Sequence, residues 1–508
     1  MRRPTRRSWS LVCSRCSRLR PGSGGDGMIA LDLIILIPLL LAVVAPVSAR
    51  LSSTAPRWIA LMGAGVQGAL LWSLGASGLW SGAVLESHPV AGLGGVWSLV
   101  TDGFSTPLLL LTAVVGALAV VASWNVSKRP GAHFGLLLLL QAAVATVFLA
   151  DNLVLFYIAW ESVLVPMFFL IAGWGSSDAR RASMKFLVFT FAGGVVLLLG
   201  IIYVAVSAEG ISFAKVAAET SSIRMPVLAF WLLAIGFLVK LPAFGLHTWL
   251  PDAHTEAPTA GSIILAGVLL KLGGYALIRL GIGLVPAGFE VARPALAVLA
   301  VFGIVLGAGS ALVQTDLKRL VAYSSISHMG FVLLAIAAGS PFALGGALVL
   351  MVSHGLVAGM LFFLVGALYE RTHTRELSAF GGLGAVAPRW SLAFVFFSLA
   401  SAGLPGLSGF PGEFAALLAG YSSWGWWMAL AGVGIVLAAA YNLRAMRDTV
   451  QGPTLAEVLK LTDLDLRERA VSLAVAGLVL VLGIAPWLVT DPAAYVLGAI
   501  ARTTTGGQ

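Results

Sequence analysis

Two lysines stand out in an otherwise apolar part of this 508-residue chain. Lys240 and Lys271 each lie inside a long apolar stretch, and the polar turn between them holds two histidines and two acids in residues 247–256. A charged side chain at the centre of a membrane helix costs about 2.5–3.5 kcal/mol even on the most lenient scale. We therefore expect these lysines to contribute to function.

Six ionisable residues are expected well within the apolar stretches of the chain: Glu161, Lys240, Lys271, His328, His354 and Glu413. A series of acids, bases and imidazoles near the midplane of a bilayer is what a proton relay needs. A lysine beside a carboxylate can release its proton when the carboxylate's charge moves away. Histidines between such groups can pass protons on.

Each of these residues also has a purely structural interpretation. A lone membrane histidine can hold helices together by hydrogen bonding, which applies to His328 and His354. Glu161 and Lys240 can form a structural ion pair, although two apolar side chains would do the same job at lower cost. Residues 247–256 fall at the end of an apolar run, where they are expected to shape a turn or a proton entrance.

The composition is that of a polytopic membrane protein. Hydrophobic residues make up 59% of the chain and charged residues only 10%, with a mean hydropathy of +0.97. A soluble protein would carry roughly 25% charged residues. The net charge of +9 does not indicate a nucleic-acid partner, because the basic residues lie at loop ends, as membrane topology produces.

The predicted fold class is all-α, with about fourteen transmembrane helices. Apolar runs near the ~20 residues needed to span a bilayer occur at 29–49, 57–79, 102–124, 133–150, 152–173, 183–207, 226–248, 257–281, 293–313, 321–339, 343–369, 390–421, 425–446 and 470–490.

Two of these runs, 226–248 and 390–421, contain helix breakers beside a charged residue. Pro242 and Gly245 follow Lys240, and a stretch rich in glycine and proline (403–412) precedes Glu413. Each break falls in the fourth helix of a five-helix group. Paired interrupted helices in inverted repeats indicate a transport pathway at the midplane, so we predict two inverted five-helix repeats.

The predicted organisation has six parts: a basic N-terminal extension (1–27), three membrane helices (28–130), a first repeat (131–282), a second repeat (291–447), a cytoplasmic amphipathic segment (448–469), and a last membrane helix with a tail (470–508). We expect the extension to be disordered or to precede a true start at Met28. The only cysteines, Cys13 and Cys16, lie in it without a second pair of ligands nearby, so no metal site is predicted.

Lysines and arginines concentrate in the loops after odd-numbered runs, for example at Lys128, Arg180 and Lys318. The positive-inside rule places these loops in the cytoplasm and both termini outside. The chain has neither a phosphate-binding loop nor a dinucleotide fingerprint. Facing histidine pairs for haem are also missing, so we predict no cofactor on this chain.

Several motifs of this sequence resemble the antiporter-like proton-pumping subunits of respiratory complex I (NADH-quinone oxidoreductase), above all the subunit M branch. They are Trp160-Glu161-Ser-Val-Leu-Val-Pro166, Val239-Lys240-Leu-Pro-Ala-Phe-Gly-Leu-His247, Leu270-Lys271-Leu-Gly-Gly-Tyr275, Ser324-Ser-Ile-Ser-His328 and Gly409-Phe-Pro-Gly-Glu413. Related subunits usually carry lysine at the position of Glu413, and glutamate there favours subunit M.

This resemblance implies a role for each of the six residues. Glu161 would tune the relay lysine Lys240, and Lys271 would be the connecting lysine. His328 and His354 would be the bridging imidazoles of the path, and Glu413 would be its terminal acid. It also implies L-like and N-like partner subunits, quinone reduction elsewhere in the complex, and a bacterial plasma membrane. Alternatives are a subunit of a cation/proton antiporter, a subunit of a hydrogenase-type complex, and a passive membrane scaffold.

Overall fold

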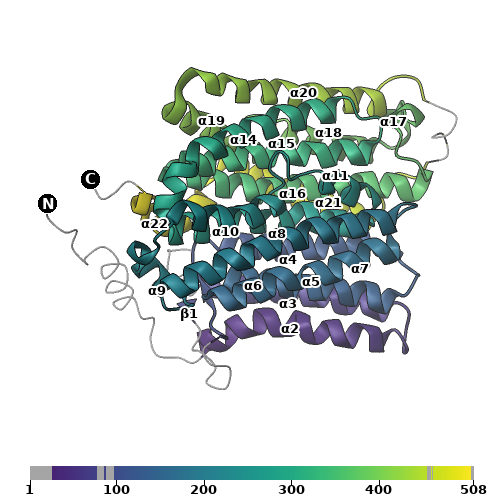
Figure 1. The fold of residues 1–508 in the computed structure, drawn as a ribbon. Coiled ribbons are helices and arrows are strands. Elements are labelled where there is room, and N and C mark those ends of the chain that lie inside the picture. Colours follow the sequence, from purple (N-terminus) through teal and green to yellow (C-terminus); the bar gives the residue numbers. More distant parts are fainter. Residues whose placement is uncertain (1–25, 77–84, 87–95, 455–458, 460, 505–508) are drawn as a thin grey trace.

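The computed structural model describes residues 26–76, 85–86, 96–454, 459 and 461–504, and nearly all of them are helical (Figure 1). Most helices run side by side, with α2 (Asp26–Ser48) and α3 (Ala55–Ala76) along one edge and α20 (Ala429–Val450) along the opposite one. By length and composition, ten helices of the described residues could cross a membrane, or eleven if a bent pair counts as one span. The all-α membrane fold is confirmed, whereas the number fourteen and the inverted repeats stay predictions.

The first half of the chain contains a two-stranded antiparallel sheet and the helices of the predicted first repeat. After α3 the elements are β1 (Leu85–Glu86), β2 (Val100–Thr101), α4 (Thr106–Ala122), α5 (Pro130–Leu149), α6 (Leu153–Ser162), α7 (Leu164–Trp174), α8 (Ala179–Ser207), α9 (Phe213–Ala218), η3 (Thr220–Ser222), α10 (Pro226–Lys240), α11 (Trp249–Glu256), α12 (Thr259–Ile264), η4 (Leu265–Leu269), α13 (Leu270–Ala276) and η5 (Leu277–Ile282).

The described residues of the second half form helices joined by loops. Its elements are α14 (Pro286–Leu312), α15 (Leu317–Ala338), α16 (Pro341–Thr372), η6 (Leu377–Ala379), α17 (Leu383–Val386), α18 (Pro388–Ser401), α19 (Gly409–Trp424), η7 (Gly425–Met428), α20, α21 (Leu466–Ile484) and α22 (Trp487–Thr504). Each of the fourteen predicted runs overlaps at least one helix of the structure.

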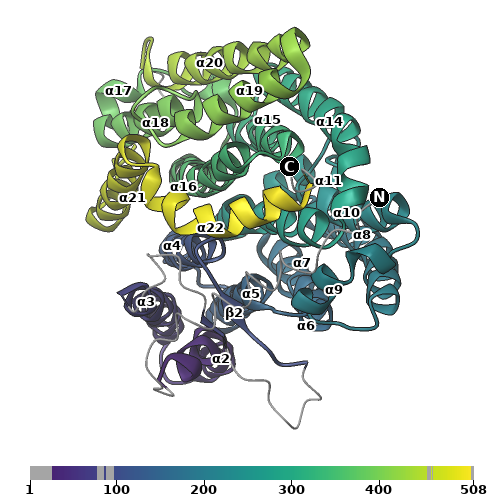
Figure 2. The ribbon, with the colours of Figure 1, turned by 90° about the vertical axis from the view of Figure 1, so that its left-hand side faces the viewer.

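Three helical segments form the centre of the bundle. The apolar window of α16 is 100% buried, and those of α15 and of the continuous segment from α12 to η5 are each 94% buried. The window of α8 is only 39% buried, so α8 faces outward. A helix that is hydrophobic on all sides belongs in the interior, and Figure 2 shows α16 enclosed by its neighbours. Lys271, His328 and His354 all lie on these central segments.

Both predicted helix breaks are present. One interruption separates α10, which ends at Lys240, from α11, and it contains Gly245 with a positive φ of 85°. The other separates α18 from α19 and contains Gly403 and Gly406, with φ of 73° and 91°. Only glycine adopts such angles without steric cost. Proline ends regular helical hydrogen bonding in both breaks, so the sequence itself dictates where the backbone opens.

The C-terminal region differs from the tail that the sequence predicted. Residues 487–504 form α22, which is bent by 59° from α21 and lies across one end of the bundle beside α16 (Figure 2). Of the predicted amphipathic segment 448–469, residues 455–458 and 460 lie outside the described residues, as do 1–25 with both cysteines.

A buried ion pair joins the start of α4 to η5. Arg279 donates to Asp102 Oδ2 at 2.6 Å, and the side chains are 15% and 4% exposed. Asp102 Oδ1 also accepts the backbone N–H groups of Phe104 and Ser105, each at 3.0 Å. The carboxylate thus has a partner on both oxygens, as burial of a charge requires.

We expect Asp102→Asn to destabilise the fold by about 3–5 kcal/mol, because it leaves the Arg279 guanidinium buried without its counter-ion. Arg447→Gln is the control, since it removes an ion pair with Asp448 whose arginine is 69% exposed, and exposed pairs contribute about 0–1 kcal/mol. Thermal unfolding of both variants in detergent measures the difference. Equal unfolding temperatures would contradict the structural importance of the Asp102–Arg279 pair.

Candidate functional site

The six predicted residues come from six different helices. Glu161 lies on α6, Lys240 at the end of α10, Lys271 on α13, His328 on α15, His354 on α16 and Glu413 on α19. All except Glu161 are at most 6% exposed. The structure brings four of them into one group, while Glu161 and Lys240 form a second group with Trp160.

Lys240 is bound to Trp160. Its Nζ donates to the Trp160 carbonyl oxygen at 2.8 Å and lies 3.8 Å from the centroid of the Trp160 ring. A cation over a desolvated indole face is held electrostatically. The Glu161 and Lys240 charges interact, yet among the ion pairs of the described residues within 4.0 Å none joins them. The two residues therefore do not form the close staple that the structural interpretation supposes.

Glu161 occupies space left by a glycine. A Cβ atom on Gly194 of α8 would lie 1.9 Å from Glu161 Oε1, so any larger residue there would displace the carboxylate. This oxygen is buried and has no hydrogen-bond partner in the described part of the chain. A buried acceptor without a partner costs about 1–3 kcal/mol, and such exceptions often mark functional groups.

Lys271 contacts His354 directly. Its Nζ lies 2.6 Å from His354 Nδ1 and also donates to the Ala266 carbonyl in the π-helical turn η4. An ammonium has only protons to give, so Nδ1 accepts when Lys271 is charged. The ring then carries its own proton on Nε2, which is buried without a hydrogen-bond partner among the described residues.

His328 follows His354 and leads to Glu413. The two imidazole centroids are 5.5 Å apart. His328 Nε2 lies 2.9 Å from the Ser401 carbonyl oxygen and 3.5 Å from Glu413 Oε1. Because a carbonyl only accepts, this nitrogen bears the ring proton. The spatial order is thus Lys271, His354, His328, Glu413, and His354 rather than His328 is the neighbour of the lysine.

A small cavity, lined by both polar and apolar residues, lies against the last three residues of this group. It measures about 10 Å³, and its lining includes His328, His354, Glu413, Ser353 and Ser401. That volume is at the lower limit for one water molecule, and a buried water needs two to four polar partners. The lining supplies them, so one water can bridge the histidines to the carboxylate.

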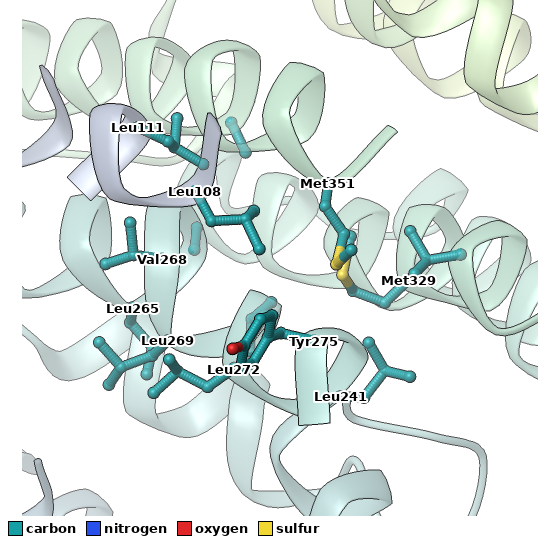
Figure 3. Packing of buried hydrophobic residues seen from close by; sticks show 14 of the residues in the cluster. Leu108, Leu111, Leu241, Leu265, Val268, Leu269, Leu272, Tyr275, Met329 and Met351 are labelled. Carbon is teal, nitrogen blue, oxygen red and sulfur yellow. The ribbon is translucent and has the colours of Figure 1, made fainter. Parts of the chain in front are cut away.

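The two groups are separated by apolar packing. A second cavity of about 10 Å³ lies against Lys240 and is lined mainly by apolar residues, among them Leu265, Leu269 and Leu270. Figure 3 shows how Leu265, Leu269, Leu272 and Tyr275 fill the space around this part of the bundle. An apolar cavity of this size stays dry. The described residues thus offer no continuous hydrogen-bonded path from Lys240 to Lys271.

His254 is a residue whose importance the sequence analysis missed. It lies on α11, is fully buried, and stacks on Phe362 of α16 with ring centroids 4.5 Å apart. Neither of its ring nitrogens has a hydrogen-bond partner in the described part of the chain. Its charge interacts with Lys318, Lys271 and His354. The helical spacing after the Lys240 break could have indicated that His254 is buried. It could not have indicated which residues lie next to His254.

The other polar residues of the turn hold loops together. Lys185 donates to Asp252 Oδ2 at 2.6 Å, and Glu256 Oε2 accepts the backbone N–H of Asp178 at 3.0 Å. These contacts fasten the ends of α11 to α8. The sequence predicted a turn over residues 247–256, but the structure forms the helix α11 over residues 249–256.

The part of the chain that contains both helix breaks matches a known protein family. A family model described as NADH:quinone oxidoreductase/Mrp antiporter, transmembrane, matches residues 150–438, more than half of the sequence. The chain belongs to this family. The match begins just before α6 and ends within α20, so it includes all six predicted residues.

Named relatives cover most of the chain. NADH-quinone oxidoreductase subunit M of Pseudomonas aeruginosa is 39% identical over 90% of this chain and 94% of its own length. The subunit M of Rhodobacter capsulatus is 37% identical over 91% and 94%. An NAD(P)H-quinone oxidoreductase chain 4 of Synechococcus sp. (strain JA-3-3Ab) is 46% identical over 78% and 77%.

Solved structures share the fold. A chain of respiratory complex I from Thermus thermophilus with bound NADH superimposes with a TM-score of 0.85 at 30% identity, over 93% of this chain and 99% of that one. A chain of the Mrp complex from Dietzia sp. DQ12-45-1b reaches 0.82 at 21% identity, over 94% and 98%. The second likeness shows the fold alone.

The two glycines of the second break give a test of the site's packing. Both have positive φ, so alanine strains the backbone at either position by roughly 1–2 kcal/mol. A Cβ on Gly403 would lie 2.3 Å from Glu413 Oε2, whereas one on Gly406 would meet nothing within 4 Å. We expect Gly403→Ala to lower the unfolding temperature more than Gly406→Ala.

We attribute the larger loss of stability in Gly403→Ala to the clash with Glu413. This extra loss is therefore expected to shrink when Glu413→Ala is also present, because residues in contact couple in double-mutant cycles. Thermal unfolding of the four Gly403/Glu413 combinations measures this coupling. Strictly additive effects would show that the Gly403 position does not constrain the carboxylate.

Proposed function

We propose that this chain is a proton-translocating membrane subunit of an NADH-quinone oxidoreductase, working through Glu161, Lys240, Lys271, His354, His328 and Glu413. The observation that carries the proposal is the buried line from Lys271 through His354 and His328 to Glu413. Membrane-buried ionisable residues are expensive and mark ion or proton pathways. The family and the named relatives support the same function.

The path from Lys271 to Glu413 has one direct contact and one cavity beside its remaining members. A proton can pass where donor and acceptor lie about 2.6–3.2 Å apart, or through one water. Lys271 and His354 meet the direct condition at 2.6 Å. The cavity next to His354, His328 and Glu413 is large enough for one water molecule, which would serve the remaining steps. His254 is buried close enough to Lys271 and Lys318 for their charges to interact, but neither of its ring nitrogens has a hydrogen-bond partner among the described residues.

Electron transfer is assigned to other subunits. In this proposal the chain carries no cofactor, and quinone reduction elsewhere in the complex drives the movement of charge at Glu161 and Lys240. The neighbours would be L-like and N-like subunits in a bacterial plasma membrane, with both termini on the outer side. Purification of the chain together with NADH dehydrogenase activity would separate this proposal from a cation/proton antiporter or a hydrogenase-type complex.

The roles of Lys240 and Glu161 can be tested directly. We expect Lys240→Ala and Glu161→Ala to assemble but to lower NADH-driven proton pumping at least about tenfold, since acid–base groups typically contribute ~10²–10⁴. Lys240→Arg is also expected to fail, because arginine does not release its proton. Lys215→Ala, at an exposed lysine that binds Glu209 O, is the control.

Acidification of reconstituted vesicles measures the pumping, and subunit content after purification measures assembly. Normal acidification with Lys240→Ala or Glu161→Ala would rule out the relay. Loss of assembly in these variants alone would favour the passive scaffold.

A comparison of His354 with His133 offers a second test. His354→Gln retains an acceptor for Lys271 but cannot be protonated, so we expect pumping to fall about tenfold or more while the complex stays intact. His133→Gln is the matched control, because His133 is equally buried but lies off the path, with Nε2 2.8 Å from Ser123 Oγ. Equal pumping by the two variants would remove His354 from the path.

A further inference from the structure

A groove on the outer surface of the bundle has no role in the proton path. It lies between α2, α5 and α7 and has a volume of about 570 Å³. Leu39 and Val43 of α2, Leu136 of α5 and Phe169 of α7 line it. Val43 and Phe169 are 69% and 51% exposed, so the described residues leave this apolar face open.

The groove ends at two basic residues that the fold holds in place. Arg129 lines the groove, precedes the first turn of α5, and has a positive φ of 47°. Lys128 Nζ donates to the Gly173 carbonyl at 2.7 Å, and Trp174 Nε1 donates to the Lys128 carbonyl at 2.7 Å. These crossed hydrogen bonds fix the α4–α5 loop against the end of α7.

The basic end lacks a counter-charge. Arg129 is exposed, and its guanidinium takes part in no hydrogen bond or ion pair that the structure shows for the described residues. No acidic residue lines the groove. Arg50, two residues beyond the end of α2, is exposed at the same end. The groove therefore combines an apolar slot with positive charge at one end and Trp174 beside it, an arrangement typical of a membrane interface.

We propose that this groove binds one bilayer phospholipid, with an acyl chain along α5 and an anionic headgroup at Arg129 and Lys128. The volume falls within the range of small-molecule sites, about 300–1,000 Å³. A partner's transmembrane helix, about 10–12 Å wide and 30 Å long, needs far more room. Basic residues at the membrane surface attract anionic lipids, so the site is expected to prefer a lipid with an anionic headgroup. The site does not depend on the proposed proton path.

Photoactivatable lipids test this site in the intact parent complex, reconstituted in vesicles. Phosphatidylglycerol and phosphatidylcholine that carry the same diazirine acyl chain are compared, and labelled residues are mapped by mass spectrometry. We expect phosphatidylglycerol to label Leu136 and Phe169 about fivefold more than phosphatidylcholine, the factor that one basic surface residue supplies. Val43→Trp, which fills the slot, is expected to abolish labelling by both lipids.

Two arginine variants separate a headgroup site from general surface charge. Arg129→Gln is expected to reduce phosphatidylglycerol labelling severalfold, toward the phosphatidylcholine level, with Lys128 as the remaining basic residue. Arg181→Gln, at an exposed arginine near the start of α8 that does not line the groove, is expected to leave it unchanged. Equal labelling of the wild type by both lipids, equal loss in both arginine variants, or cross-links to another subunit without lipid adducts would each overturn the proposal.

Discussion

The hydrogen bond between Lys271 and His354 is the contact on which the rest of the site depends. It joins the last helix of the predicted first repeat to the central helix of the second, at a point where neither side chain reaches solvent. A lysine charge at that depth is tolerated only when its protons find acceptors. His354 and the Ala266 carbonyl provide them. The bond thus satisfies the buried ammonium. It also places Lys271 in direct contact with a histidine of the predicted second repeat.

The two helix breaks place charges of opposite sign at suitable helix ends. Lys240 is the last residue of α10, where the partial negative charge of a helix C-terminus favours a cation. Glu413 lies one turn inside the N-terminus of α19, where the field favours an anion. Breaking a membrane helix exposes backbone groups that must be satisfied within protein or at a water-filled cavity. The Trp249 indole N–H, 3.1 Å from the Val239 carbonyl, satisfies one of them.

The sequence predicted the features that follow from local chemistry. Apolar length predicted the membrane helices, and Pro242, Gly403 and Gly406 predicted the breaks, because these residue types restrict the backbone wherever they occur. Ionisable residues within apolar runs indicated the six residues of the candidate site, and their roles stay predictions. The order of the two histidines was not predictable, since both lie on long apolar helices whose rotation depends on packing.

Trp160 and His254 were missed for a related reason. An aromatic residue before Glu161 and a histidine in a polar turn look ordinary in sequence. Their importance arises only when α10 lies over the Trp160 ring and α11 lies against α16. The helix α22 escaped prediction because its sequence, with Pro492 inside it, lacks a long apolar run.

The apolar gap between Lys240 and Lys271 interrupts the proposed proton path. If the two lysines were joined by a permanent chain of polar groups, protons could run along the whole path without any input of energy. The leucine-lined cavity beside Lys240 prevents this while Lys240 rests on Trp160. A charge that drew Lys240 away from the indole would open that space to water. The water would then solvate the Lys240 ammonium. In the proposed function, transfer across the gap therefore depends on where Lys240 points, and that dependence would couple a distant reaction to proton movement through buried groups.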